Sequence, residues 1–92
     1  VIYKFRCAKE NKRGWRTRSL GRDDFSYQQK IDNEWKEITI EAELLVGKIS
    51  RVIYFKAVEN WSDYPEWAQD RDEIIQRIKI EYPPHQTEYE ND

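Results

Sequence analysis

The chain has 92 residues, 37% of them charged and 38% hydrophobic, and its formal net charge is −2. A chain of this length forms one small domain, and its four Trp, six Tyr and three Phe indicate a packed core rather than a disordered chain. One cysteine excludes a disulfide scaffold, the lack of a Cys/His cluster excludes a structural zinc site, and no apolar run approaches the roughly 20 residues of a membrane-spanning helix.

Charge is unevenly distributed along the chain. Residues 1–22 hold eight Lys or Arg against one acid, a net +7, whereas the remaining residues hold eight against seventeen, a net −9. Charge that segregates in this way is either neutralised within the fold or presented to a partner. The single cysteine and the basic residues near the start of the chain, where a signal peptide would be apolar, favour a reducing compartment, and we expect a cytoplasmic protein.

The first two predicted strands are basic. Residues 1–8 alternate between apolar and basic positions, which predicts a strand with Cys7 buried as an ordinary core residue. Residues 15–20 alternate again, with Arg on one side. The polar segment 9–14 ends in glycine and would join the two strands into a basic hairpin.

This hairpin supplies the candidate partner-binding residues Lys9, Lys12, Arg13, Trp15, Arg16 and Arg18. Arg and Lys interleaved with aromatic residues are typical of surfaces that neutralise phosphates and stack on bases. The alternative is pairing of Arg16 and Arg18 with Glu41 and Glu43 across the sheet, or pairing with an acidic protein. We expect Arg18 to be paired inside the fold, with Glu41 and Glu43 as the candidate partners, and the tip residues Lys12 and Arg13 to be free.

Two periodicities compete over residues 25–37. Phe25, Tyr27, Gln29 and Ile31 fit a strand, after which Asp32-Asn33 would be a two-residue turn. A helical stripe fits the same segment, with Asp23 or Asp24 as its N-cap. The hairpin is favoured, because Asp-Asn is poor in a helix interior and the following segment is a strand.

Two strand-like runs between Ile38 and Ala57, joined by a turn at Val46-Gly47, are expected to organise the domain. The first alternates strictly between apolar and polar side chains up to Leu44. The second is apolar on both faces from Val52 to Phe55, which predicts an interior strand.

The C-terminal part predicts one helix and a tail. Asp63 and Glu66 resemble a capping box around Pro65, and apolar residues at helical spacing continue from Tyr64 to Tyr82. Pro83-Pro84 would end the helix. Residues 85–92 have the composition of a flexible acidic tail, so the domain is expected to span residues 1–84.

Together these elements predict an α+β domain, a mostly antiparallel sheet of four or five strands with one C-terminal amphipathic helix across a face. No catalytic, cofactor-binding or metal-binding residues can be assigned. His85 lies in the expected tail without a defined nucleophile, and the carboxylate pairs Asp23-Asp24 and Glu41/Glu43 lack an assignable third ligand. A small non-catalytic binding module for a protein partner is therefore expected, with an acidic protein as one candidate partner and nucleic-acid binding as the alternative function.

Overall fold

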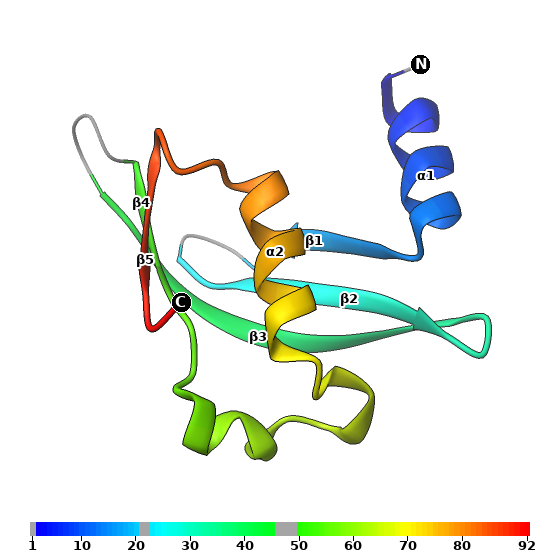
Figure 1. Ribbon diagram of the computed structural model, residues 1–92. Coiled ribbons are helices and arrows are strands. Elements are labelled where there is room, and N and C mark those ends of the chain that lie inside the picture. The colour runs from blue at the N-terminus through cyan, green and yellow to red at the C-terminus, as the bar shows by residue number, and fades with distance from the viewer. Residues whose placement is uncertain (1, 21–22, 46–49) are drawn as a thin grey trace.

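The computed structural model describes residues 2–20, 23–45 and 50–92, with only the backbone described for residues 2–7. Five strands form one sheet in the order β1-β2-β3-β4-β5, with one helix across it and a second helix beside β1 (Figure 1). The first four strands pair antiparallel, and β4 pairs with β5 in parallel. The predicted α+β class and the mostly antiparallel sheet are confirmed. Both described α-helices fall short of the length and apolar character needed to cross a membrane.

The N-terminal segment is a helix, so the predicted first strand is wrong. Helix α1 spans Ile2–Arg13 and ends at Gly14, whose φ of +81° is the left-handed conformation of a helix C-terminus. The Gly14 N–H donates to the Glu10 carbonyl at 2.9 Å, and Lys12 and Arg13 lie in the last turn, where cations favour the helix dipole. The basic hairpin therefore does not exist, and the expected place of the Cys7 side chain falls outside the described side chains.

The following hairpin was predicted correctly. Strand β1 spans Trp15–Ser19, β2 spans Phe25–Ile31 and β3 spans Glu34–Leu44. Asp32 and Asn33 form the turn between β2 and β3 with φ of 51° and 67°, the paired positive values of a type I′ turn. Strand β3 is the middle strand, and its residues Ile38, Ile40 and Ala42 are buried as the alternation predicted.

Strand β4 spans Arg51–Tyr54 and lies between β3 and β5, so it is the interior strand that the apolar run predicted. The predicted turn at Val46-Gly47 lies outside the described residues. The segment 85–92 is not a tail, because Thr87–Glu90 forms β5 beside β4. Thr87 is buried, and the Tyr89 ring stacks on Phe55 at 6.1 Å, which anchors an otherwise acidic segment.

The C-terminal helix is shorter than predicted. Two 3₁₀ helices, η1 (Val58–Asp63) and η2 (Glu66–Ala68), precede helix α2, which spans Arg71–Glu81. The predicted capping box fails, because Asp63 is the last residue of η1 and the backbone is extended at both Tyr64 and Pro65, each with a ψ of 158°. Asp70 is the N-cap instead, and its carboxylate accepts the Glu73 N–H at 3.2 Å.

Helix α2 covers one face of the sheet and closes the core. Its buried residues Ile74, Ile75 and Ile78 join the core cluster formed by the inward residues of the strands. The Phe25 ring packs against Tyr82 at 4.9 Å, just beyond the helix. Burying isoleucines of this kind contributes about 2 kcal/mol each, so α2 supplies much of the stability. No helix among the described residues lies across the opposite face of the sheet, which we call the helix-free face.

Candidate functional site

Three of the six candidate residues serve the fold instead of a partner. Trp15 is only 6% exposed and belongs to the core. The Arg13 guanidinium lies 3.6 Å from the centroid of the Trp15 ring and forms an ion pair with Glu81. Arg18 forms an ion pair with Glu10, not with Glu41 or Glu43, because β1 pairs only with β2. The prediction that Arg18 is paired is thus confirmed with a different partner, and the prediction that Arg13 is free is wrong.

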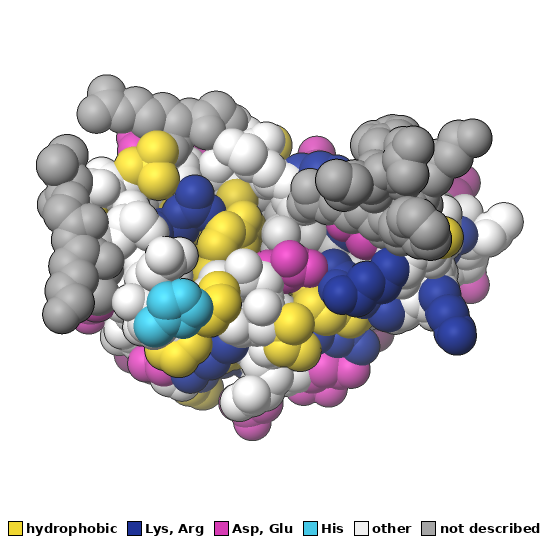
Figure 2. All heavy atoms as spheres, turned by 90° about the horizontal axis from the view of Figure 1, so that it is seen from above, with side chains coloured by type: hydrophobic (Ala, Val, Ile, Leu, Met, Phe, Trp, Pro, Cys, Tyr) yellow, Lys and Arg dark blue, Asp and Glu magenta, His cyan; other side chains and the backbone are white. Residues whose placement is uncertain are grey.

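The remaining three candidates lie on two different elements. Lys9 and Lys12 are exposed on α1, whereas Arg16 lies in β1 on the sheet. On the face of the molecule drawn in Figure 2, Lys and Arg side chains are separated by acidic and apolar side chains. The structure therefore does not gather the six residues into one surface.

Arg16 belongs to a small aromatic cluster on the sheet. Its guanidinium lies 3.9 Å from the centroid of the Trp35 ring, and its Nε donates to Gln28 at 2.5 Å. The Lys30 ammonium group lies 5.8 Å from the same ring. The two-residue turn explains this arrangement, because it places Trp35 directly opposite Lys30 in the register of β2 and β3. We call Arg16, Lys30 and Trp35 the Trp35 cluster.

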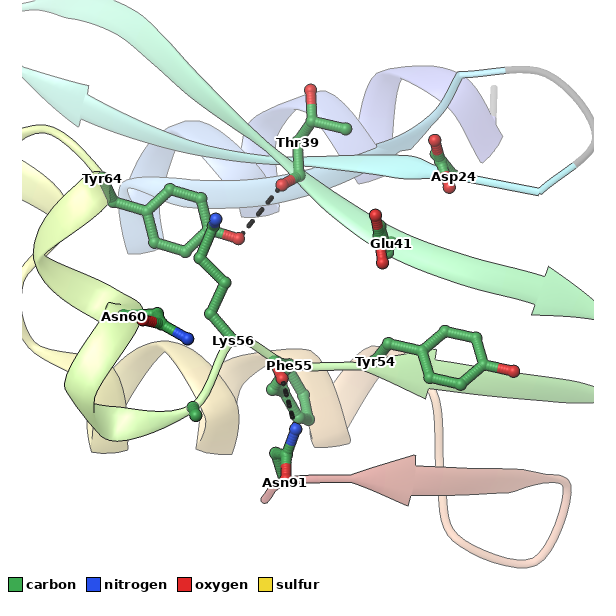
Figure 3. Close-up of a pocket in the computed structure, with 10 residues that line it drawn as sticks. Asp24, Thr39, Glu41, Tyr54, Phe55, Lys56, Asn60, Tyr64 and Asn91 are labelled. Carbon is green, nitrogen blue, oxygen red and sulfur yellow. Dashed lines mark hydrogen bonds between the residues drawn. The ribbon is translucent and has the colours of Figure 1, made fainter.

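By the strand register, the Trp35 cluster lies on the helix-free face of the sheet, on the same side as Thr39 and Glu41. Figure 3 is seen from this side, with α2 behind the sheet. The strand register places these charged and aromatic side chains on that face: Arg16, Arg18, Lys30, Trp35, Glu37, Glu41, Glu43, Tyr54, Glu88 and Glu90. Positive charge lies on β1 and β2, and the glutamates lie on β3 and β5. No described Lys or Arg forms an ion pair with these five glutamates.

A pocket of about 510 Å³ opens where β4 separates from β3, and we call it the fork pocket (Figure 3). Strand β4 pairs with Glu41–Leu44 only, after which the chain turns away at Phe55. The Asn91 side chain holds this departure by donating to the Phe55 carbonyl at 3.3 Å. The pocket is lined by Asp24, Thr39, Glu41, Tyr54, Phe55, Lys56, Ala57, Asn60, Tyr64 and Asn91.

Charges of both signs line the fork pocket. The Lys56 ammonium group lies 3.7 Å from an Asp63 carboxylate oxygen and 5.3 Å from the centroid of the Tyr64 ring. The Tyr64 hydroxyl donates to the Thr39 carbonyl at 3.2 Å, and burial together with the charge of Glu41 raises the pKa of Tyr64 to about 12. Tyr64 therefore stays a neutral donor at physiological pH and cannot act as a base there.

The tyrosine at the other side of the pocket is also a donor. The Tyr54 hydroxyl donates to a Glu43 carboxylate oxygen at 3.0 Å, and this hydrogen bond raises the pKa of Tyr54. Both tyrosines thus remain protonated beside glutamates, which keeps this part of the face acidic and rich in aromatic surface.

The backbone of β3 is unpaired along part of one edge. Even-numbered residues of β3 turn their N–H and C=O groups toward β2, as the register with β2 requires, and odd-numbered residues turn theirs toward β4. Because β4 ends at Tyr54, it reaches only as far as Glu41. Among the described residues, nothing bonds to the N–H and C=O groups of Trp35 and Glu37, and Thr39 receives only the Tyr64 hydroxyl.

Of the two carboxylate pairs, Asp23-Asp24 accepts hydrogen bonds from the backbone. Asp24 accepts the Ala42 N–H at 3.3 Å, and Asp23 accepts the Leu44 N–H at 3.4 Å. These two carboxylates therefore bond to the edge of β3 that faces β2, at residues where β2 itself no longer pairs with it. Within residues 8–20, 23–45 and 50–92, no group of three or more acidic, His or Cys side chains is placed to hold a metal ion. His85 is exposed in the turn that precedes β5.

The sequence missed this site for a specific reason. Both the open edge of β3 and the fork pocket depend on where β4 stops and where the chain goes next, and neither is set by local periodicity.

Comparisons with protein-family models, with curated proteins and with solved structures found no match.

Proposed function

We propose that this domain is a non-catalytic module that binds another protein through the helix-free face of its sheet. The supporting observation is that this face keeps Trp35 and Tyr54 accessible among charged side chains, while α2 buries the other face. Exposed aromatic residues next to Arg are enriched in protein interfaces, where they become the residues that contribute most to affinity.

Nucleic-acid binding, the alternative, has less support. Arg13 and Arg18 are engaged by Glu81 and Glu10, and five exposed glutamates lie on the same face as the Trp35 cluster. Phosphate groups approaching this face would meet more negative charge than positive charge. The fork pocket offers no nucleophile with an adjacent base, which is why a binding role is preferred over a catalytic one.

The proposal can be tested by selecting ligands from a peptide library displayed on phage and mapping their binding by NMR. We expect the amide shifts to change at strand residues of the helix-free face. Trp35→Ala should weaken the selected ligands about tenfold or more, as loss of a central interface aromatic does. Ile80→Ala is the matched control, because Ile80 is 66% exposed on α2, which covers the other face, and the change should leave affinity unchanged.

Two outcomes would overturn the proposal. The first is ligand binding that shifts only residues of α1 or α2 and is insensitive to Trp35→Ala. The second is displacement of every selected peptide by polynucleotide, with an affinity for the polynucleotide that falls steeply as salt is added.

A further inference from the structure

From the open edge of β3 we infer that the partner segment is an extended basic peptide that adds to the sheet as a strand beside residues 35–39. This inference rests on the proposed protein-binding function and names the chemistry of the ligand. In strand addition, backbone hydrogen bonds supply affinity and alternate side chains supply specificity.

Backbone acceptors at the edge of β1 are bonded, whereas no described residue bonds to those of Trp35 and Glu37 at the open edge of β3. At β1, Arg13 Nε donates to the Trp15 carbonyl and Arg18 Nη1 donates to the Thr17 carbonyl, each at 2.8 Å, so two outward acceptors are occupied. Unpaired strand edges in proteins are usually blocked by such devices. On β3, the N–H and C=O groups of Trp35 and Glu37 have no such cover among the described residues.

The side chains along this edge are accessible to solvent. Trp35 is only partly buried, and Lys36, Glu37 and Thr39 are exposed. In Figure 1 the turn end of β2 and β3 extends well away from β4 and β5. A strand beside residues 35–39 would lie in the row that β4 occupies further along β3, and its end would reach the fork pocket through Thr39 and Glu41.

The charges next to this edge select a basic ligand. Glu37 is exposed, and its only described partner is the neutral amide of Gln28 at 3.1 Å. Glu41 and Glu43 follow on the same face without an ion pair to any described residue. Lys or Arg opposite Glu37 would form a favourable cross-strand pair, and a side chain opposite Trp35 would pack on its ring.

The fork pocket and Trp35 also define the direction in which the peptide would run along β3. If the peptide runs antiparallel to β3, the pairing that β4 uses, its N-terminal end lies at the fork pocket and its C-terminal end lies beside Trp35. A basic side chain near the N-terminal end would then enter the pocket toward Glu41, where Tyr54 and Tyr64 offer ring surface.

The test uses two blocked peptides on the whole domain, one of alternating lysine and valine and one of alternating glutamate and valine. We expect binding of the lysine peptide only, with slower hydrogen exchange at the Trp35 and Glu37 amides. Glu37→Pro removes the outward N–H without removing a bond to β2, since proline is tolerated at such edge positions. Compared with Glu37→Ala, which keeps the N–H, it should bind about five- to tenfold more weakly.

A second measurement does not depend on how Glu37→Pro folds. Two versions of the lysine peptide are N-methylated at alternate residues, one at the odd and one at the even positions. Methylation of the N–H groups that face β3 should abolish binding and methylation of the others should leave it intact, because only every second N–H faces β3. Equal affinity of both methylated peptides, or equal affinity for the lysine and glutamate peptides, would overturn the inference.

Two further outcomes would also overturn it. If library-selected ligands are weakened by Trp35→Ala but bind Glu37→Pro and Glu37→Ala equally, the face binds protein without strand addition, and the proposed function survives alone. If sedimentation shows a dimer that Glu37→Pro dissociates, the edge is occupied by a second copy of this chain instead of a basic peptide.

Discussion

Arg18 donates to both carboxylate oxygens of Glu10, from Nη1 at 2.8 Å and from Nη2 at 2.6 Å. The Glu10 side chain is 3% exposed and the Arg18 side chain 32% exposed, so the pair is largely withdrawn from water. It joins α1 to the outermost strand of the sheet. Glu10 is the only acid among the first 22 residues, which is how the basic N-terminal part of the chain meets part of its charge locally.

Arg18→Ser should destabilise the domain because it removes the two hydrogen bonds that Arg18 donates to the buried Glu10 carboxylate. Breaking a pair of this partly buried kind costs about 1–3 kcal/mol. Chemical denaturation measures the loss. Lys12→Ser is the matched control on the exposed side of α1, and a loss from Arg18→Ser no larger than that of the control would contradict the role of the pair.

The turn between β2 and β3 makes a prediction about backbone conformation. Asn33 has a φ of 67°, which a β-branched side chain adopts only at a cost of about 1–2 kcal/mol. Asn33→Val should therefore lower the free energy of unfolding by that amount, while Asn33→Gly should maintain or raise it. Thermal melts of the two variants provide the comparison, and equal melting temperatures would be inconsistent with a type I′ turn.

Helix α2 offers a direct test of where it begins. Asp70→Ala should lower the free energy of unfolding by about 1 kcal/mol, since it removes the acceptor for the Glu73 N–H. Asp63→Ala serves as the control, because Asp63 makes only an exposed ion pair with Lys56 at 3.7 Å and should contribute less than about 0.5 kcal/mol. A larger effect at Asp63 than at Asp70 would place the start of the helix at the earlier residue.

Tyr64 makes the stability of the domain sensitive to alkaline pH. In the unfolded chain its phenol loses a proton near pH 10, whereas in the folded protein its pKa is about 12. Between these values the unfolded state binds fewer protons than the folded state, so stability should fall as the pH rises from 10 to 12. Tyr64→Phe should make this decline shallower without abolishing it, because burial also raises the pKa of Tyr27 and of Tyr89.

Denaturation at a series of pH values, together with ultraviolet titration of the phenols, measures the alkaline effect. At neutral pH the same variant should lose about 0.5–1.5 kcal/mol with the hydrogen bond to the Thr39 carbonyl. An unchanged slope between pH 10 and 12 in Tyr64→Phe would show that Tyr64 does not titrate as described.

Local patterns in the sequence were sufficient where one pattern had no competitor of equal strength. Asp32-Asn33 determines the turn, and the alternation from Ile38 to Ala42 determines which face of β3 is buried. The prediction for the start of the chain was wrong, because alternation over eight residues does not exclude a helix. Gly14 was assigned to a hairpin, whereas it ends a helix. The last strand was not predicted, because the acidic composition of residues 85–92 indicated a tail. The two side chains that anchor this strand, Thr87 and Tyr89, were not recognised.

The candidate site was harder to predict because its residues are set by tertiary contacts. Arg13 meets Glu81 across most of the chain, and no spacing rule connects them. The open edge at Trp35 and Glu37 follows from the early end of β4, which the apolar run through Phe55 does not reveal. Of the candidate residues, Arg16 and Arg18 lie on the proposed binding face by the register of β1 and β2. Trp35, the partner of Arg16, was not among the candidates.

The parallel pairing of β4 with β5 affects how the domain can be completed during translation. The ribosome makes β4 first, then η1, η2 and α2, and only afterwards the residues Thr87–Glu90 that pair with it. Until that last segment leaves the exit tunnel, Val52 and Ile53 lie on a strand with one bare edge, which is the kind of surface that chaperones and neighbouring nascent chains bind. A release of the chain before Thr87 would leave that edge exposed for good.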